Sequence, residues 1–149
     1  KMNNLHYKKT FFLALACLAA QGAHCQSIFG KWKTIDDRNG STKAIVELYE
    51  GNGLLYGKIT QILQKDKKDA LCIKCKGHRK NKPITGMTII DGFKEQKTGI
   101  YKGSVLFDPE QGMTFKGKIW LDPENEDQLK VRGYLAFIYR TQTWVRVKE

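Results

Sequence analysis

Histidine and cysteine are scarce in this sequence, which has 3 His and 4 Cys in 149 residues. After residue 26, only Cys72, Cys75 and His78 remain. A structural zinc site takes four ligands, and these residues supply three. Any Ser-His-Asp triad would have to use His78, which lies between Gly77 and Arg79 with no carboxylate nearby in sequence. We therefore expect His78 to be an exposed loop residue, and we expect no catalytic residue, metal or cofactor.

The sequence also lacks a hydrophobic run long enough to span a bilayer. Its longest apolar run, residues 11–20, follows Lys8 and Lys9 and precedes a short polar tail. A membrane-spanning helix needs about 20 apolar residues, whereas a basic stretch followed by a shorter apolar run is typical of an export signal. We therefore predict a signal peptide at residues 1–26 and a periplasmic or secreted domain at residues 27–149, with no transmembrane segment in the mature chain.

Acidic residues are outnumbered, with 15 Asp and Glu against 26 Lys and Arg. Removing residues 1–26 takes away three lysines and no acid, which lowers the formal net charge from +11 to +8. Much of this charge lies in one polar segment, residues 64–83, which carries Lys65, Lys67, Lys68, Lys74, Lys76, Arg79, Lys80 and Lys82. Such a surface attracts anions.

If this basic segment binds a partner, anionic lipid head groups or polysaccharide are the candidates that fit its charge. Nucleic acid is not expected, because the protein is predicted to be exported and residues 64–83 hold no aromatic side chain on which a base could stack. From the sequence alone, we prefer the interpretation that the segment is a solvated loop that keeps the protein soluble.

Helical periodicity is almost absent after residue 26, where short alternating segments are separated by turn residues. The predicted strands cover residues 28–35, 44–49, 54–63, 87–90, 100–107, 113–121, 129–138 and 142–147. Asp36 and Asp37, which follow the first strand, are interpreted as turn residues and not as a general acid and base pair. The pattern predicts a single all-β domain of about eight antiparallel strands, with residues 64–83 as its one long loop.

Glycine recurs in the middle of the predicted strands, at Gly57, Gly103, Gly117 and Gly133. These positions would weaken a flat sheet, but they suit a strongly coiled one, where bends and close approaches need a residue without a Cβ atom. The pattern therefore favours a closed barrel. Within residues 113–121, the face that we expect to point inward carries Phe115, Gly117, Ile119 and Leu121.

The two ends of the domain carry matching signals. Gly30-Lys31-Trp32 lies in the first predicted strand, and Arg140 and Arg146 lie near the end of the chain. Small exported barrels of the lipocalin type often bracket their chain in this way, because the first and last strands must meet. We expect Trp32 to seal one end of the barrel, with either Arg140 or Arg146 over its indole ring.

Several segments in combination resemble one known family. They are residues 30–32, 36–37, 44–49, 56–59, 72–77, 82–87, 108–112, 131–134 and 140–146. Together they resemble the exported bacterial proteins of domain of unknown function 2147. The resemblance implies a lipocalin-like (calycin-like) β-barrel and an exported location. It implies no catalytic residue, because the family has no established activity.

The Cys72-x-x-Cys75 pair has three interpretations. In an exported protein it forms a disulfide that clamps the lysine-rich loop, and chain entropy then contributes only about 2 kcal/mol because the closed loop is so small. As a redox dithiol it would need a helix N-terminus or similar positive field. As a metal site it would take His78 as a third ligand. We prefer the disulfide, and keep a redox or metal-dependent protein as the alternative function.

The interior of the barrel decides which function we predict. An eight-stranded barrel is just wide enough to be filled by side chains or to hold one small ligand. If a cavity exists, we expect Tyr56, Phe115, Ile119 and Tyr134 to surround it. The sequence thus predicts a non-catalytic protein that binds a small apolar, lipid-like or amphiphilic molecule, or an envelope component. A filled core would instead indicate a structural or interaction barrel.

Overall fold

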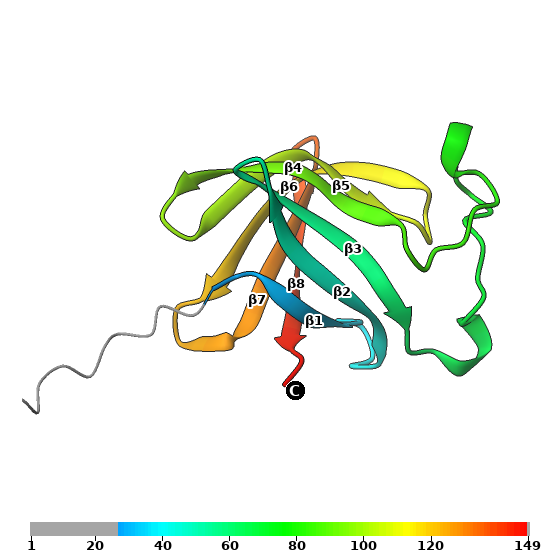
Figure 1. Cartoon of the computed structure of the whole chain (residues 1–149), viewed down its shortest axis with the longest axis horizontal. Coiled ribbons are helices and arrows are strands. Elements are labelled where there is room, and N and C mark those ends of the chain that lie inside the picture. Colours follow the sequence, from blue (N-terminus) through cyan, green and yellow to red (C-terminus); the bar gives the residue numbers. More distant parts are fainter. Residues whose placement is uncertain (1–26, 149) are drawn as a thin grey trace, which may run out of the picture.

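The computed structural model of the chain describes residues 27–148, which form one closed antiparallel barrel (Figure 1). Its strands are β1 (Gly30–Ile35), β2 (Thr42–Gly51), β3 (Leu54–Ile62), β4 (Thr88–Lys97), β5 (Ile100–Asp108), β6 (Met113–Asp122), β7 (Asn125–Leu135) and β8 (Ile138–Arg146). Each strand pairs with the next, and β8 pairs with β1. The predicted all-β barrel is confirmed, and it closes within residues 30–146. The predicted signal peptide lies outside the described residues.

Strand β4 is longer than the sequence indicated, because Asp91-Gly92 forms a bulge just after residue 90, where the predicted strand ended. Gly92 has a φ of 67°, and the pairing of β4 with β3 shifts register between Leu55 and Gly57. A bulge of this kind bends a strand without ending it. The strand therefore continues to Lys97 and brings Phe93 into the barrel interior.

The turn between β7 and β8 lies earlier than predicted, at Ala136 and Phe137. Leu135 and Ile138 pair across it, and Ala136 adopts a left-handed φ of 53°. No glycine, proline or asparagine marks this turn in the sequence, and those are the residues from which such turns are usually recognised.

The segment between β3 and β4 forms a long excursion at the right of Figure 1. It contains two short 3-10 helices, η2 (Lys65–Lys67) and η3 (Gly77–Arg79). Cys72 and Cys75 form a disulfide within it, and both are buried. The segment packs on the β5–β6 turn, where a Cβ atom at Gly112 would overlap the carbonyl oxygen of Lys74.

The two ends of the barrel differ in how they are filled. The closed end, which carries the β2–β3, β4–β5 and β6–β7 turns, is packed around Phe93. The Phe93 ring lies against Gly103 and Gly117, and a Cβ atom at Gly117 would come within 2.5 Å of it. The other fully buried large side chains of this core include Trp32, Leu48, Leu55, Ile119 and Leu129. Mid-strand glycines therefore make room for an aromatic ring in the barrel interior.

Trp32 and Arg146 lie together at the closed end, where β1 and β8 pair. The Arg146 guanidinium carbon lies 4.2 Å from the centroid of the Trp32 ring, and the Trp32 indole donates a 2.9 Å hydrogen bond to the Ile28 carbonyl oxygen. Arg146 also donates a hydrogen bond to the Ser27 carbonyl oxygen. Arg140 does not take part, because it lies near the opposite end, where it binds Asp37.

Candidate ligand-binding cavity

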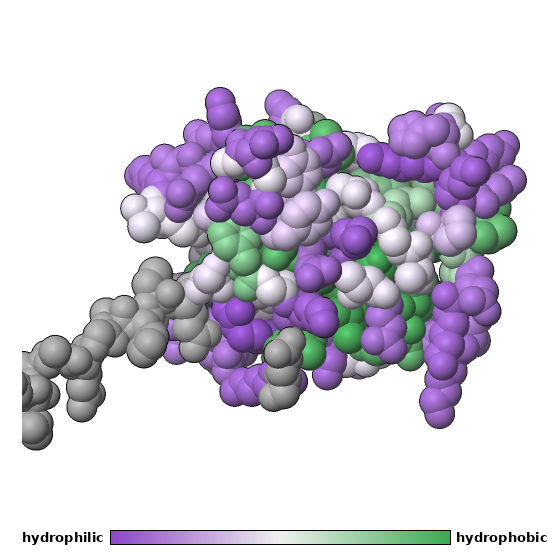
Figure 2. Space-filling view, viewed as in Figure 1, coloured by the Kyte–Doolittle hydropathy of each residue, from purple (hydrophilic) through white to green (hydrophobic). Residues whose placement is uncertain are grey.

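The open end of the barrel, which carries the β1–β2, β5–β6 and β7–β8 turns and the long β3–β4 segment, is hollow. Its cavity has a volume of about 770 Å³, and its apolar walls include Val46, Ile59, Ile62, Ile89, Leu106, Phe115, Val131 and Trp144. Hydrophobic surface shows on this side of the molecule, bordered by the hydrophilic side chains of the long segment (Figure 2). The volume falls within the range of about 300–1,000 Å³ that is typical of small-molecule sites.

Phe115 lies in the wall of this cavity, as alternation along β6 predicted. Ile119 shares the inward face of β6, but it is fully buried in the packed core and does not line the cavity. Two positions along the same face therefore serve different purposes. Phe115 faces the space at the open end, and Ile119 helps to fill the closed end.

Tyr56 and Tyr134 do not line the cavity, and the prediction that they surround it is wrong. Tyr56 stacks on Tyr49 at a centroid distance of 5.7 Å, and Tyr134 packs against Tyr139 at 6.0 Å. Both tyrosines face outward. Side chains alternate between the two faces of a strand, and the adjacent Gly57 and Gly133 occupy the inward positions. The tyrosine hydroxyls therefore offer no polar contact inside the barrel.

Trp144 and Gln142 are cavity residues that the sequence analysis missed. The Trp144 indole nitrogen donates a 3.1 Å hydrogen bond to the Gln142 side-chain oxygen, which satisfies the one polar atom of the ring. The signal was available, since inward placement of Arg146 puts Trp144 and Gln142 on the same face of β8.

An ion-pair network braces one side of the cavity mouth. The buried Asp36 carboxylate accepts hydrogen bonds of 2.8 and 3.0 Å from the Arg38 guanidinium, and Lys43 Nζ lies 3.3 Å from it. These contacts, led by the Arg38 hydrogen bond, hold the pKa of Asp36 well below its usual range. Lys43 in turn binds Glu110 of the β5–β6 turn at 2.5 Å. The network therefore connects the β1–β2 turn, strand β2 and the β5–β6 turn at the mouth of the cavity.

Glu110 also connects the rim to the long segment, through Lys67 Nζ at 3.7 Å. Partial burial, the largest single influence, acts to raise the pKa of Glu110, but the contacts with Lys43 and Lys67 together outweigh it, and the pKa is lowered. Arg140 and Asp37 form a further pair at the mouth, and the Arg140 hydrogen bond lowers the pKa of Asp37. Lys74, which also lines the cavity, forms no ion pair within residues 27–148.

The disulfide lies beside the mouth, since Leu71, Ile73 and Lys74 all line the cavity. Because Cys72 and Cys75 are bonded to each other, neither presents a thiolate to a metal ion or a substrate in this structure. Within the described residues, no group of three or more His, Cys, Asp and Glu side chains is placed to hold a metal ion. In the same range, no helix is long and apolar enough to cross a membrane.

A closed eight-stranded barrel with an apolar cavity open at one end defines a lipocalin-like protein. The chain belongs to the family described as uncharacterized protein conserved in bacteria (DUF2147), whose model matches residues 30–146. A similar solved structure is protein HP1028 from the human pathogen Helicobacter pylori, which belongs to the lipocalin family. The likeness has a TM-score of 0.69 and 16% identity and covers 83% of this chain and 84% of that one. At this identity it shows the fold alone. No curated protein matches the sequence.

Proposed function

We propose that this protein is an exported, non-catalytic binding protein that holds a small apolar or amphiphilic molecule in the open end of its barrel. The observation that carries the proposal is the apolar cavity of about 770 Å³. A site of this kind binds by excluding water from an apolar ligand, while a few polar groups set its orientation. Here the apolar side chains form the walls and the charged side chains gather at the mouth.

The arrangement of charge supports an amphiphile with an anionic or polar head. Lys43 and Arg140 at the mouth are neutralised by Glu110 and Asp37, whereas Lys74 forms no ion pair among the described residues. An acyl chain would therefore enter the cavity through its mouth, and the head group would stay at the mouth near Lys74. A buried anion deep in the barrel is not proposed, because the walls there offer it no cation.

Export is supported by the leader-like sequence of residues 1–26 and by the disulfide. Disulfides persist in oxidising compartments such as the periplasm, and Cys72–Cys75 is such a bond. Fractionation of the native host tests this part of the proposal. The processed chain should appear in the periplasm or the medium, and an unprocessed chain in the cytoplasm would contradict export.

A neutral fluorescent probe, N-phenyl-1-naphthylamine, tests the cavity directly. We expect one site on the purified domain, residues 27–149, and displacement of the probe by a long-chain fatty acid. Gly133→Leu should abolish binding, because Gly133 lines the cavity and a Cβ atom there would make only ordinary contacts with Leu106 and Phe115, at 3.5 and 3.6 Å, so that the rest of the added side chain would occupy the space. Phe115→Ala should also change the affinity, since it alters the wall.

Tyr134→Leu is the matched control, because Tyr134 lies next to Gly133 on the same strand and faces outward. It should bind the probe like the wild type. A wild-type domain without a probe site, or a Gly133→Leu variant that binds as well as the wild type, would refute the proposed site.

A further inference from the structure

Large hydrophobic side chains are exposed around the mouth of the cavity. Phe137 is 93% exposed, Ile73 74% and Ile138 63%, the highest values among the large hydrophobic residues that the structure describes. Together with Leu71 and Leu135 they form what we call the apolar rim. Leu71, Ile73, Leu135 and Ile138 line the mouth itself, and Phe137 lies in the turn between Leu135 and Ile138.

This rim comes from two separate segments, the long β3–β4 segment and the β7–β8 turn. Exposed apolar side chains that gather at one end of a soluble domain mark a surface that contacts a partner. The outer wall of the barrel is different. Val145 on β8, for example, is 39% exposed, and its partners on the neighbouring strands are Lys33 and Gln128.

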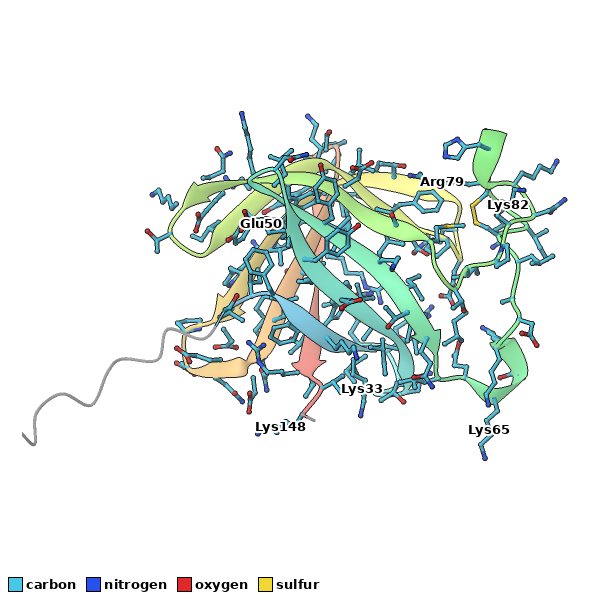
Figure 3. All side chains as sticks on the ribbon, viewed as in Figure 1. Lys33, Glu50, Lys65, Arg79, Lys82 and Lys148 are labelled. Carbon is cyan, nitrogen blue, oxygen red and sulfur yellow. A yellow bond between two sulfur atoms is a disulfide. The ribbon has the colours of Figure 1, made fainter. Side chains whose placement is uncertain are left out.

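Basic side chains lie next to the apolar rim. Lys74 and Lys76 follow Ile73 closely, and Lys65, Lys80 and Lys82 extend from the same segment; Figure 3 shows Lys65, Arg79 and Lys82 on it. None of these lysines forms an ion pair with a described residue. Apolar tips beside unpaired lysines match a surface that offers acyl chains behind a layer of negative charge.

Charge also argues against a second copy of the chain as the partner. Two open ends that meet would bring two lysine-rich segments together, and like charges repel at such a contact. An anionic lipid bilayer complements both features at once, because phosphate groups meet the lysines and the acyl boundary receives the apolar side chains.

We propose that the open end of the barrel docks on an anionic membrane surface, with Phe137, Ile138 and Ile73 inserted at the lipid interface and the neighbouring lysines on the head groups. In this orientation the cavity mouth faces the bilayer, so that an amphiphile passes between bilayer and cavity with little contact with water. The inference deepens the proposed function, but docking needs only the rim and the lysines. The two are therefore tested separately.

Vesicle sedimentation with the domain, residues 27–149, tests docking. The domain should sediment with vesicles that contain phosphatidylglycerol and stay in solution with vesicles of phosphatidylcholine alone, and added salt should weaken the binding. Phe137→Glu should lower the partition coefficient about tenfold or more, the order expected when one large apolar side chain is kept from an apolar medium. Val145→Glu, on the outer wall, is the matched control and should bind like the wild type.

A second pair of variants separates the charge from the apolar contact. Lys76→Gln combined with Lys80→Gln should weaken sedimentation with phosphatidylglycerol vesicles, whereas the equally exposed pair Lys31→Gln and Lys97→Gln, away from the mouth, should change it much less.

Binding of N-phenyl-1-naphthylamine should be retained by Phe137→Glu, because Phe137 does not line the cavity. Loss of vesicle binding with retained probe binding therefore supports docking through the rim. Docking is refuted if the wild type does not sediment with anionic vesicles, or if Phe137→Glu and Val145→Glu lose vesicle binding equally. A wild-type dimer that Phe137→Glu dissociates, without any vesicle binding, would identify the rim as a contact between copies instead.

Discussion

The closed and open ends of this barrel use the same strands and the same alternation of inward and outward residues, yet one end is packed and the other hollow. Gly117 and Gly133 illustrate the difference, because they are paired in register on β6 and β7. The Phe93 ring occupies the space above Gly117, whereas a Cβ atom at Gly133 would meet only ordinary contacts at 3.5 Å or more. A glycine in the barrel wall thus leaves space in the interior. That space is filled where another side chain packs against the glycine, as Phe93 does at Gly117, and stays open where none does.

The largest expected effect comes from emptying the closed end. Phe93→Ala should lower the free energy of unfolding by about 3–5 kcal/mol, because it leaves a cavity in a fully packed core. Phe115→Ala at the open end should cost clearly less, since its ring already borders empty space. Urea unfolding measures both, and Phe137→Ala, on an exposed turn, serves as a control that should stay within about 0.5 kcal/mol of the wild type. Equal losses for Phe93 and Phe115 would mean that both ends are packed.

The paired glycines provide a finer test of the same difference. Gly117→Ala places a methyl group within 2.5 Å of the Phe93 ring, and such overpacking typically costs about 1–3 kcal/mol. Gly133→Ala should be neutral or slightly stabilising, because the methyl group finds space and alanine loses less backbone entropy on folding than glycine. Thermal unfolding of the two variants measures this difference in stability. Similar losses in both would contradict a hollow open end.

Acid should affect the open end through its ion pairs. The pKa of Asp36 is lowered in the folded protein, so its carboxylate stabilises the fold fully above its unfolded pKa of about 3.9, and this contribution is lost as the pH falls below that value. Asp36→Asn should therefore lower the melting temperature at neutral pH and reduce its fall on acidification. Asp91→Asn, at an exposed position of β4, is the control. An unchanged acid profile in Asp36→Asn would contradict a role for this network in bracing the rim.

The smallest predicted effect concerns the turn that the sequence did not reveal. Ala136 holds a left-handed φ of 53°, a conformation that glycine adopts with less strain. Ala136→Gly should raise the stability by less than about 1 kcal/mol, because the relief of strain is partly offset by the greater freedom of glycine in the unfolded chain. Ala44→Gly, within β2, should instead lower it. If both variants lose stability to the same extent, the left-handed turn is not the source of strain.

The sequence was sufficient for the architecture, because alternation and turn residues are local features, and because Trp32 near one end with Arg140 or Arg146 near the other indicated that the first and last strands meet. It also placed Phe115 correctly on the inward face. It did not place Phe93, since Asp91-Gly92 has the composition of a turn and only pairing with β3 shows it to be a bulge. The packing of Phe93 in the closed end therefore could not be predicted from the pattern of β4 alone.

The errors at Tyr56 and Tyr134 have one physical cause. Both were expected inside because each lies in the middle of a predicted strand, on a face that alternation could turn inward, and because a tyrosine hydroxyl offers a polar contact to an amphiphile. The adjacent glycines, Gly57 and Gly133, were assigned to bends and close approaches. In this barrel the glycines occupy the inward positions, so their neighbours face outward. The rim network was beyond reach for another reason, because Lys43 and Glu110 are separated by 67 residues and meet only when the barrel closes.

A crystal structure of the domain with a fatty acid brominated at the end of its chain tests the central claim most directly. The account predicts an anomalous bromine peak inside the open end, near Leu106, Phe115 and Val131, with the carboxylate at the mouth. Bromine found only on the outer surface, or an interior that side chains fill completely, would contradict the account.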